Sequence, residues 1–328
     1  MEPIGEPSNL RIPLGFALLL LLAALFSFLN LFAGTADISW TDVFTARNEG
    51  VSTVSRIFWD IRVPRLVAAV LSGVALSLSG LSLQTLFRNP LAGPFVLGIS
   101  SGASFGVALS LLAGFSFGHF GVLSSAAVGA FAVSVLIMLV ARQFENPTIL
   151  LIVGLLTGYF VDALVSMLIV NSAAESLRVY VSWGMGSFAR LTYDCIWIYA
   201  LAVFVGMGML ALCIRYLNAA RLGDEFAKGL GVDVRRGRML VLLASTILAA
   251  SSTAFCGPVA FVGIAVPHLA FMLFKTSDHR ILFPGAALCG IVLCLASGLF
   301  TTIPLNAVLS LVGVPVVIWV VFRSRGSA

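Results

Sequence analysis

The segment GPFVLGI at residues 93–99 returns in a related form, GPVAFVGI, at residues 257–264. The first glycines of the two segments are 257 − 93 = 164 residues apart, which is half of the 328-residue chain. In an apolar sequence, a helix that starts after a Gly-Pro pair begins from irregular backbone, which protein must bury or a water-filled cavity must surround. Membrane transporters often contain inverted repeats with short or broken helices at corresponding positions. The two segments therefore predict a membrane protein made of two related halves.

The composition of the whole chain agrees with this prediction. Hydrophobic residues make up 60% of the sequence and charged residues only 10%, whereas soluble domains carry about 25% charged residues. The net charge of +5 comes from basic residues in short loops, which indicates membrane orientation rather than binding to nucleic acid. The five cysteines lie in apolar segments without a C-x-x-C pair. This placement predicts free thiols rather than disulfides or a metal site.

A membrane-spanning helix needs about 20 mainly apolar residues. Ten apolar runs fit this requirement, although several are short, and five fall in each half. We therefore predict an all-α integral membrane protein in which residues 1–328 form one transmembrane domain, with inverted five-helix halves over about 1–171 and 195–328. The predicted spans lie near residues 13–33, 66–86, 95–113, 121–141, 149–171, 195–214, 239–256, 258–274, 283–300 and 303–322.

The basic residues predict the orientation. An even number of spans places both termini on one side, and cytoplasmic loops are enriched in Lys and Arg. With both termini in the cytoplasm, 19 − 6 = 13 of the Lys and Arg residues lie inside, several of them in the loop 215–238. This orientation describes a multi-pass protein of the cell inner membrane. The six basic residues outside are Arg47, Arg56, Arg62, Arg65, Arg178 and Arg190.

Two segments outside the spans have the composition of ordered structure. Residues 34–65 form a long external connection. Residues 172–190 are too short and polar to span, so we expect a surface-lying helix that ends near Gly184.

Three motifs resemble one family of transport proteins. RNPLAGPFVLGISSGASFG (88–106), LGDEFAKGLGV (222–232) and GPVAFVGIAVPHLA (257–270) resemble the permease subunits of type II ABC importers for iron chelates, haem and cobalamin. The resemblance runs in order from about residue 57 to 323. It implies ten helices per subunit, a pore formed by a homodimer, two ATP-binding subunits and an extracytoplasmic substrate-binding protein.

The chain itself is not expected to be an enzyme. Its sequence contains no Gly-Lys dipeptide and therefore no G-x-x-x-x-G-K-[ST] loop for ATP phosphates. ATP would be used by a separate ATPase chain, and this chain is expected to bind no cofactor.

The loop 215–238 contains a candidate short helix. Asp224 and Glu225 suit the positive N-terminal end of a helix, and Gly229 or Gly231 can end it in the left-handed conformation. Leu222, Phe226 and Leu230 recur every four residues and form one apolar stripe. The resemblance makes this segment the cytoplasmic coupling helix that contacts the ATPase. The alternative is a helix that only covers its own bundle. The predicted coupling residues are Glu225, Phe226, Ala227 and Gly231.

On the external side, the resemblance makes Arg62 and Arg65 docking residues for the binding protein. Exposed charges of this kind steer association and fix orientation. The alternative is a pair of anchors whose charged ends reach the membrane surface. The family pattern also contains a longer external connection with an arginine, where this chain has only ASGLFTTIPLN at 296–306. One docking charge is therefore missing.

On the cytoplasmic side, two turns match gate positions of the resembling importers. One contains Asn89 and Leu91, and the other contains Asn146 and Thr148. Ordinary turn chemistry of asparagine next to proline is the alternative explanation for both.

A third group of residues is a candidate for the translocation path. Asp162 lies within the fifth span, and an ionisable group at that depth is a functional hypothesis by default. Pairing with a local hydroxyl or backbone group is the alternative. Ser100 and Ser101 lie among glycines spaced every four residues, a pattern that also serves close helix packing. The three histidines are scattered and predict no metal site.

The sequence thus predicts the permease subunit of an ATP-driven, binding-protein-dependent importer. An iron-siderophore complex is the first candidate substrate, haem and cobalamin follow closely, and an oxyanion such as molybdate is the next. An ion-coupled secondary transporter with inverted repeats is the alternative function, and a structural membrane protein without transport is the third.

Overall fold

The computed structural model describes residues 10–32, 53–115, 121–144 and 146–325. In these ranges the chain forms helices joined by turns. The helices are α1 (Arg11–Phe32), α3 (Thr53–Arg56), η1 (Ile57–Arg62), α4 (Val63–Phe87), η2 (Pro94–Leu97), α5 (Ile99–Leu111), α6 (Val122–Gln143), α7 (Pro147–Val170), α8 (Ala174–Gly184), η3 (Phe188–Arg190), α9 (Tyr193–Leu212), α10 (Ile214–Ala220), α11 (Asp224–Gly229), α12 (Val234–Cys256), α13 (Val262–Phe274), α14 (His279–Gly298) and α15 (Leu305–Arg325).

The ten predicted spans correspond to ten of these helices. Seven are long and apolar enough to cross a membrane, namely α1, α4, α6, α7, α9, α12 and α14. Three further apolar helices occupy the remaining predicted positions, namely the short helices α5 and α13 and, over Leu305–Trp319, α15. The predicted surface helix is α8, which ends at Gly184 as expected. All five cysteines are free and buried, which confirms the prediction made from their positions.

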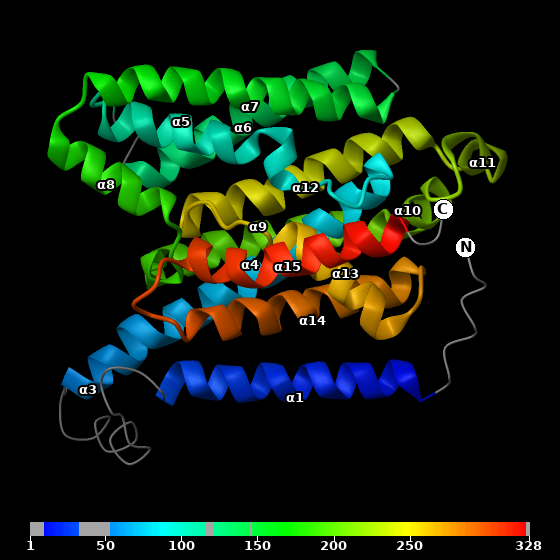
Figure 1. Cartoon of the computed structure of the whole chain (residues 1–328), viewed down its shortest axis with the longest axis horizontal. Coiled ribbons are helices and arrows are strands. Elements are labelled where there is room, and N and C mark those ends of the chain that lie inside the picture. Colours follow the sequence, from blue (N-terminus) through cyan, green and yellow to red (C-terminus); the bar gives the residue numbers. More distant parts are fainter. Residues whose placement is uncertain (1–9, 33–52, 116–120, 145, 326–328) are drawn as a thin grey trace.

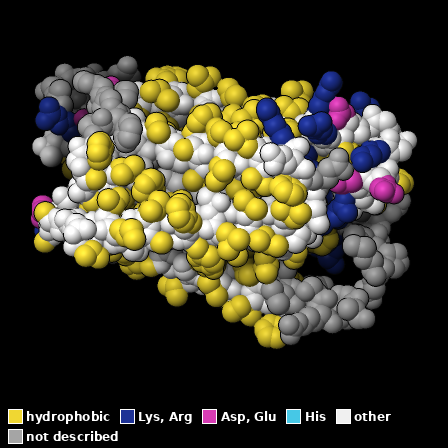
Figure 2. Space-filling view, turned by 90° about the horizontal axis from the view of Figure 1, so that it is seen from above, with side chains coloured by type: hydrophobic (Ala, Val, Ile, Leu, Met, Phe, Trp, Pro, Cys, Tyr) yellow, Lys and Arg dark blue, Asp and Glu magenta, His cyan; other side chains and the backbone are white. Residues whose placement is uncertain are grey.

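The long helices run along the long axis of the bundle, between its two ends (Figure 1). The start of α1 and the end of α15 lie at the same end of the molecule as α10 and α11, while α3 and α8 lie at the other end (Figure 1). Hydrophobic side chains cover the surface between these ends, and charged side chains gather at the end that carries α11 (Figure 2). This arrangement agrees with cytoplasmic termini and a cytoplasmic loop 215–238.

Helix α4 forms the centre of the bundle. It packs against α9, α12, α13 and α14. In the most apolar 18-residue stretch of this span 78% of the residues are buried, compared with 11% in that of α1. Small residues allow this close approach, because a Cβ atom added at Gly80 would lie 1.8 Å from the carbonyl oxygen of Gly263 in α13. Likewise, Gly102 and Gly106 of α5 face Gly129 and Ser125 of α6. The glycines spaced every four residues therefore serve helix packing.

The two Gly-Pro segments are matching interruptions of the helical bundle. We call residues 88–98 the first break and residues 257–261 the second break. In the first, η2 is followed by Gly98 in the left-handed conformation, with φ 70°, and then by α5. In the second, Phe261 takes a left-handed conformation, with φ 64°, directly before α13. Both breaks thus lead into helices of the same length, 13 residues each.

The first break meets the start of α13, directly after the second break, inside the protein. A Cβ atom added at Gly263, just after the second break, would lie 2.9 Å from the ring of Pro94 in the first. A Cβ atom added at Gly93 would lie 3.1 Å from the side chain of Ile264. Irregular backbone at this depth is therefore covered by protein, as a membrane environment requires.

Candidate functional site

The predicted short helix of the loop 215–238 is α11. Gly223 precedes it with φ 121°, and Gly231 follows it with φ 76°. The amide of Gly231 donates to the carbonyl oxygen of Lys228 at 2.9 Å, and the amide of Val232 donates to that of Ala227 at 3.1 Å. Gly231 is therefore the residue in the left-handed conformation after this helix, one of the two glycines that the sequence proposed.

The apolar stripe of this helix faces outward from the chain. Leu222, Phe226 and Leu230 are 67%, 50% and 62% exposed. Glu225 is exposed as well, whereas Ala227 is fully buried against its own chain. Ala227 therefore supports the helix from beneath and does not belong to the exposed face. The contact of Glu225 and Phe226 with an ATPase stays a prediction.

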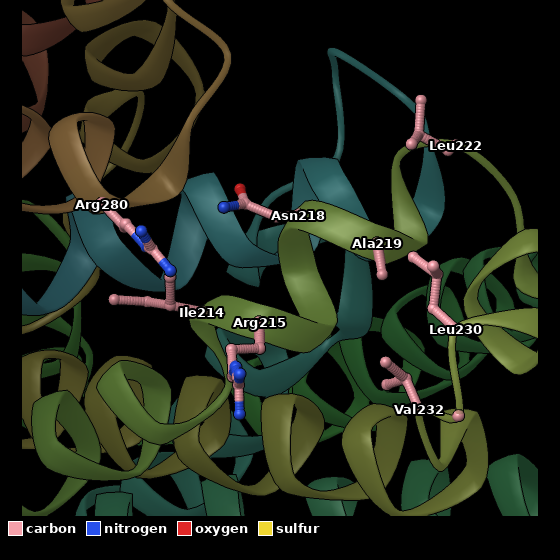
Figure 3. Close-up of a pocket in the computed structure, with 9 residues that line it drawn as sticks. Ile214, Arg215, Asn218, Ala219, Leu222, Leu230, Val232 and Arg280 are labelled. Atoms are coloured by element: carbon pink, nitrogen blue, oxygen red, sulfur yellow. The ribbon is translucent and has the colours of Figure 1, made fainter.

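A hollow of about 550 Å³ lies beside this stripe, between α10, the end of α11 and the start of α14. Figure 3 shows Leu222 and Leu230 on one side of it and the guanidinium groups of Arg215 and Arg280 on the other. The exposed face at the cytoplasmic end is thus an apolar stripe next to a basic rim.

Asp224, the first residue of α11, joins three helices by ion pairs that sequence reasoning missed. Its Oδ1 atom accepts from Nη2 of Arg88 at 2.7 Å, and its Oδ2 atom accepts from Nη2 of Arg238 at 2.8 Å. Arg238 also hydrogen-bonds Tyr216 of α10, and burial raises the pKa of Tyr216 to about 12. The only sequence signal was the charge of these residues near helix ends, because each pair joins two different helices, across 136 positions for Arg88 and 14 positions for Arg238.

The two predicted gate turns show local turn chemistry. Oδ1 of Asn89 accepts from the amide of Leu91 at 2.9 Å. Oδ1 of Asn146 accepts from the amide of Thr148 at 2.9 Å and caps the start of α7. The first turn has an additional long-range contact, because Nε2 of His268 in α13 lies 2.9 Å from the carbonyl oxygen of Pro90. Their role as a gate stays a prediction.

The structure separates the candidate path residues. Ser100 is buried within the chain, and Ser101 is half-buried next to Gly158 of α7. The side chain of Asp162 is exposed on α7, close enough to Tyr180 of α8 to add to the rise in the pKa of Tyr180 that burial causes. Asp162 and Ser101 therefore remain candidates for the path, whereas Ser100 faces the chain interior.

The two external arginines are tied to the bundle. Arg62 is only 8% exposed, and its Nη1 atom donates to the carbonyl oxygen of Leu31 at 2.6 Å. Nη2 of Arg65 donates to the carbonyl oxygen of Gly298 at the end of α14, at 2.5 Å. These contacts hold the external ends of α1, α4 and α14 together. The structure therefore gives both residues an anchoring role, and docking of a binding protein stays a prediction.

The short connection 299–304 leads into an external cluster of hydrogen bonds around Asn306. Its Oδ1 atom accepts from the amide of Ala260 at 2.9 Å. Its Nδ2 atom donates to the carbonyl oxygens of Pro258 at 2.9 Å and Gly184 at 3.2 Å. Asn306 thus fixes the second break to the end of α8.

The fold and this cytoplasmic face define a class: a polytopic helical permease with a short exposed helix, α11, at one end. Residues 19–323 match the FecCD transport family. The chain belongs to this family, and it is the permease subunit of an ABC importer in the cell inner membrane. Family membership decides for this class over the ion-coupled alternative.

Individual relatives agree over nearly the whole chain. The hemin transport system permease protein HmuU of Yersinia pestis is 36% identical over 328 residues, with 96% of each chain covered. The vitamin B12 import system permease protein BtuC of Salmonella paratyphi A is 32% identical over 331 residues, again with 96% of each covered. A solved inward-facing structure assigned to the metal-chelate type of ABC transporter has a TM-score of 0.83 and 29% identity, covering 95% of this chain and 99% of that one.

Proposed function

We propose that two copies of this chain form the pore of an importer for a chelated metal compound, with an iron-siderophore complex as the first candidate substrate and haem and cobalamin next. A loaded extracytoplasmic binding protein docks outside, and two ATPase subunits bind the two copies of α11 inside. The substrate passes between the two permease copies.

The exposed stripe on α11 is the observation that carries this proposal. Three large apolar side chains on a short charged segment, Leu222, Phe226 and Leu230, are each at least half exposed. Burying apolar surface against a partner is favourable by about 25 cal/mol per Å², so such a stripe at the water-facing end of a membrane protein favours a bound protein. Relatives named for hemin and vitamin B12 transport support a large chelated metal as substrate.

The cytoplasmic part of the proposal is tested at Phe226. We expect Phe226→Arg to leave the permease inserted and folded but to abolish both co-purification with the ATPase and stimulation of ATP hydrolysis. Lys228→Gln, at an exposed position of the same helix, is the matched control and should retain both. Normal stimulation by the Phe226→Arg complex contradicts the proposed coupling role.

The substrate is tested in proteoliposomes that contain the permease, its ATPase and its binding protein. Radiolabelled ferric siderophore, haem and cobalamin are supplied in parallel, with ATP inside or with only a proton or sodium gradient. We expect ATP-dependent uptake of the ferric siderophore. ATP-dependent uptake of haem or cobalamin instead corrects the substrate, and gradient-driven uptake without an ATPase overturns the mechanism.

External docking is tested by a salt titration of binding-protein association. Because Arg65 is partly exposed, we expect the Kd to rise with salt and Arg65→Gln to flatten this dependence. A salt dependence that Arg65→Gln leaves unchanged assigns Arg65 to anchoring alone.

A further inference from the structure

The carboxylate of Asp224 is the point at which α11 is attached to two spanning helices. Arg88 stands directly after α4 in a left-handed conformation, with φ 47°, and donates to Oδ1 of Asp224. Arg238, in the first part of α12, donates to Oδ2. The carboxylate therefore bridges the end of one spanning helix and the start of another through the first residue of α11.

Burial distinguishes the pair of Asp224 with Arg238 from an ordinary surface ion pair, whereas the side chain of Arg88 in the other pair is 47% exposed. The side chain of Arg238 is 7% exposed and that of Asp224 is 30% exposed. A buried guanidinium that loses its counter-ion is strongly destabilising. The pair between Asp233 and Arg236, at 3.0 Å, is 52% and 86% exposed. Exposed pairs of that kind contribute little, so Arg236 offers a matched control at the same end of the molecule.

Helix α11 depends on these attachments. It has six residues, and isolated helices below about 12 residues are marginal in water. Its contacts with the rest of the chain include the fully buried side chain of Ala227 and the ion pairs of Asp224. If α11 is displaced, either the residues that bind Asp224 must move with it, or these ion pairs must break.

Arg88 connects this attachment to the predicted gate turn. Its Nε atom donates to the carbonyl oxygen of Ala220 at the end of α10, at 3.1 Å. The next residue in the chain is Asn89, whose side chain shapes the turn by accepting from the amide of Leu91. A single peptide bond therefore joins the residue that binds Asp224 to the turn.

We propose that Asp224 is a positioning residue that transmits the movement of α11 to the turn at Asn89 and Leu91 through Arg88, while Arg238 holds it against α12. This inference rests on the proposed function, in which the ATPase moves α11. It adds a specific physical link between the face that receives the movement and the turn that opens or closes the path.

The first test measures the turn without any ATPase. A spin label is attached to Leu91→Cys, which replaces an exposed side chain; the five native cysteines are buried, and the unsubstituted chain gives the labelling background. In the full-length permease in nanodiscs, we expect Asp224→Asn and Arg88→Gln each to increase the mobile fraction of the spectrum. The double variant should show no larger change than either single variant, and Arg236→Gln should show none.

The second test measures coupling in the assembled importer. In proteoliposomes with the ATPase and binding protein, uptake of whichever of ferric siderophore, haem or cobalamin the wild type accepts is divided by the ATP hydrolysed. We expect Asp224→Asn to lower this ratio about tenfold, within the range of five- to 150-fold that coupling between sites produces. Asp224→Glu keeps the charge and should recover most of the ratio, so it also serves as the test if the chain does not tolerate Asn. Arg236→Gln should leave the ratio unchanged.

The two tests separate the failure of this inference from the failure of the proposed function. An unchanged spectrum at residue 91, or an unchanged ratio in Asp224→Asn, overturns the transmitting role of Asp224. If the wild-type complex shows no ATP-driven uptake, the proposed function fails, and the spectra of the isolated permease still decide whether Asp224 positions the turn.

Discussion

The first break, residues 88–98, and the second break, residues 257–261, begin with or contain the same Gly-Pro pair but are held by different chemistry. Charge holds the start of the first break, where Arg88 is paired with Asp224. One neutral amide holds the second, because Asn306 bonds both Pro258 and Ala260. The charged contact joins the first break to α11, whereas the neutral contact joins the second break to α8. The two halves therefore share a backbone design, while the polar contacts that hold the two breaks differ.

The largest effect is expected where α4 contacts the start of α13, directly after the second break. In Gly80→Leu, the new Cβ atom would overlap the backbone carbonyl of Gly263, 1.8 Å away, and the backbone there cannot yield as a flexible side chain could. We expect a loss of at least about 3 kcal/mol of stability, at the upper end for overpacking. Thermal unfolding in detergent measures it. Gly208→Ala, at a helical glycine with open space around it, is the control, and an unchanged midpoint for Gly80→Leu contradicts the packing described.

The next prediction tests whether the two breaks are held independently of each other. Asn306→Ala removes three side-chain hydrogen bonds and leaves the amide of Ala260 without its acceptor, so we expect a loss of about 2 kcal/mol. Hydrogen exchange should accelerate at residues 257–261 and at the end of α8 but not at residues 88–98. Asn306→Asp keeps the acceptor and should protect the amide of Ala260. Equal acceleration at both breaks would show that the two are not held independently.

A smaller effect tests the shared backbone conformation. Gly98 has a φ of 70°, and its added Cβ atom would lie 3.0 Å from the carbonyl oxygen of Gly154. We expect Gly98→Ala to cost about 1–2 kcal/mol, the penalty of a left-handed conformation for a residue with a Cβ atom. Thermal unfolding next to the Gly208→Ala control measures the difference. A neutral Gly98→Ala variant contradicts the left-handed conformation at this position.

The smallest effect concerns one hydrogen bond between the halves. Nε2 of Gln84 in α4 donates to the carbonyl oxygen of Ile264, just beyond the second break, at 3.1 Å. We expect Gln84→Leu to cost about 1 kcal/mol, the usual net contribution of one hydrogen bond. Ser166→Ala, at an exposed hydroxyl bonded within its own helix, serves as the reference. If Gln84→Leu lowers the stability no more than Ser166→Ala does, this hydrogen bond does not contribute to joining the halves.

Much of the fold could be predicted because its signals are local. Apolar runs of sufficient length predicted all ten spans, and the polar segment at 172–190 predicted α8. The acidic residues and glycines around α11 predicted that helix, because the helix dipole and the left-handed conformation act within a single turn. The separation of basic residues predicted which end of the bundle carries the loop 215–238.

The candidate site was harder to predict because it depends on direction and on distant contacts. Phe226 and Ala227 were assigned together, although neighbouring residues of a helix do not face the same way, and only Phe226 is exposed. The charge and position of Arg62 suit a docking residue, yet its side chain is buried and bonded to a carbonyl group 31 positions away in the chain. The pairs of Asp224 with Arg88 and Arg238 likewise depend on three helices meeting, which no local pattern encodes.

The contact between Pro94 and Gly263 has a thermodynamic consequence for the whole importer. The first break touches the start of α13, directly after the second break, at this contact, so the free energy of one arrangement depends on the arrangement of the other. Coupling of this kind is reciprocal: if docking inside changes the affinity for a partner outside by some factor, docking outside changes the affinity inside by the same factor. Measuring the Kd of each soluble partner with and without the other would therefore give the coupling free energy between the two ends of the protein, to which this contact contributes.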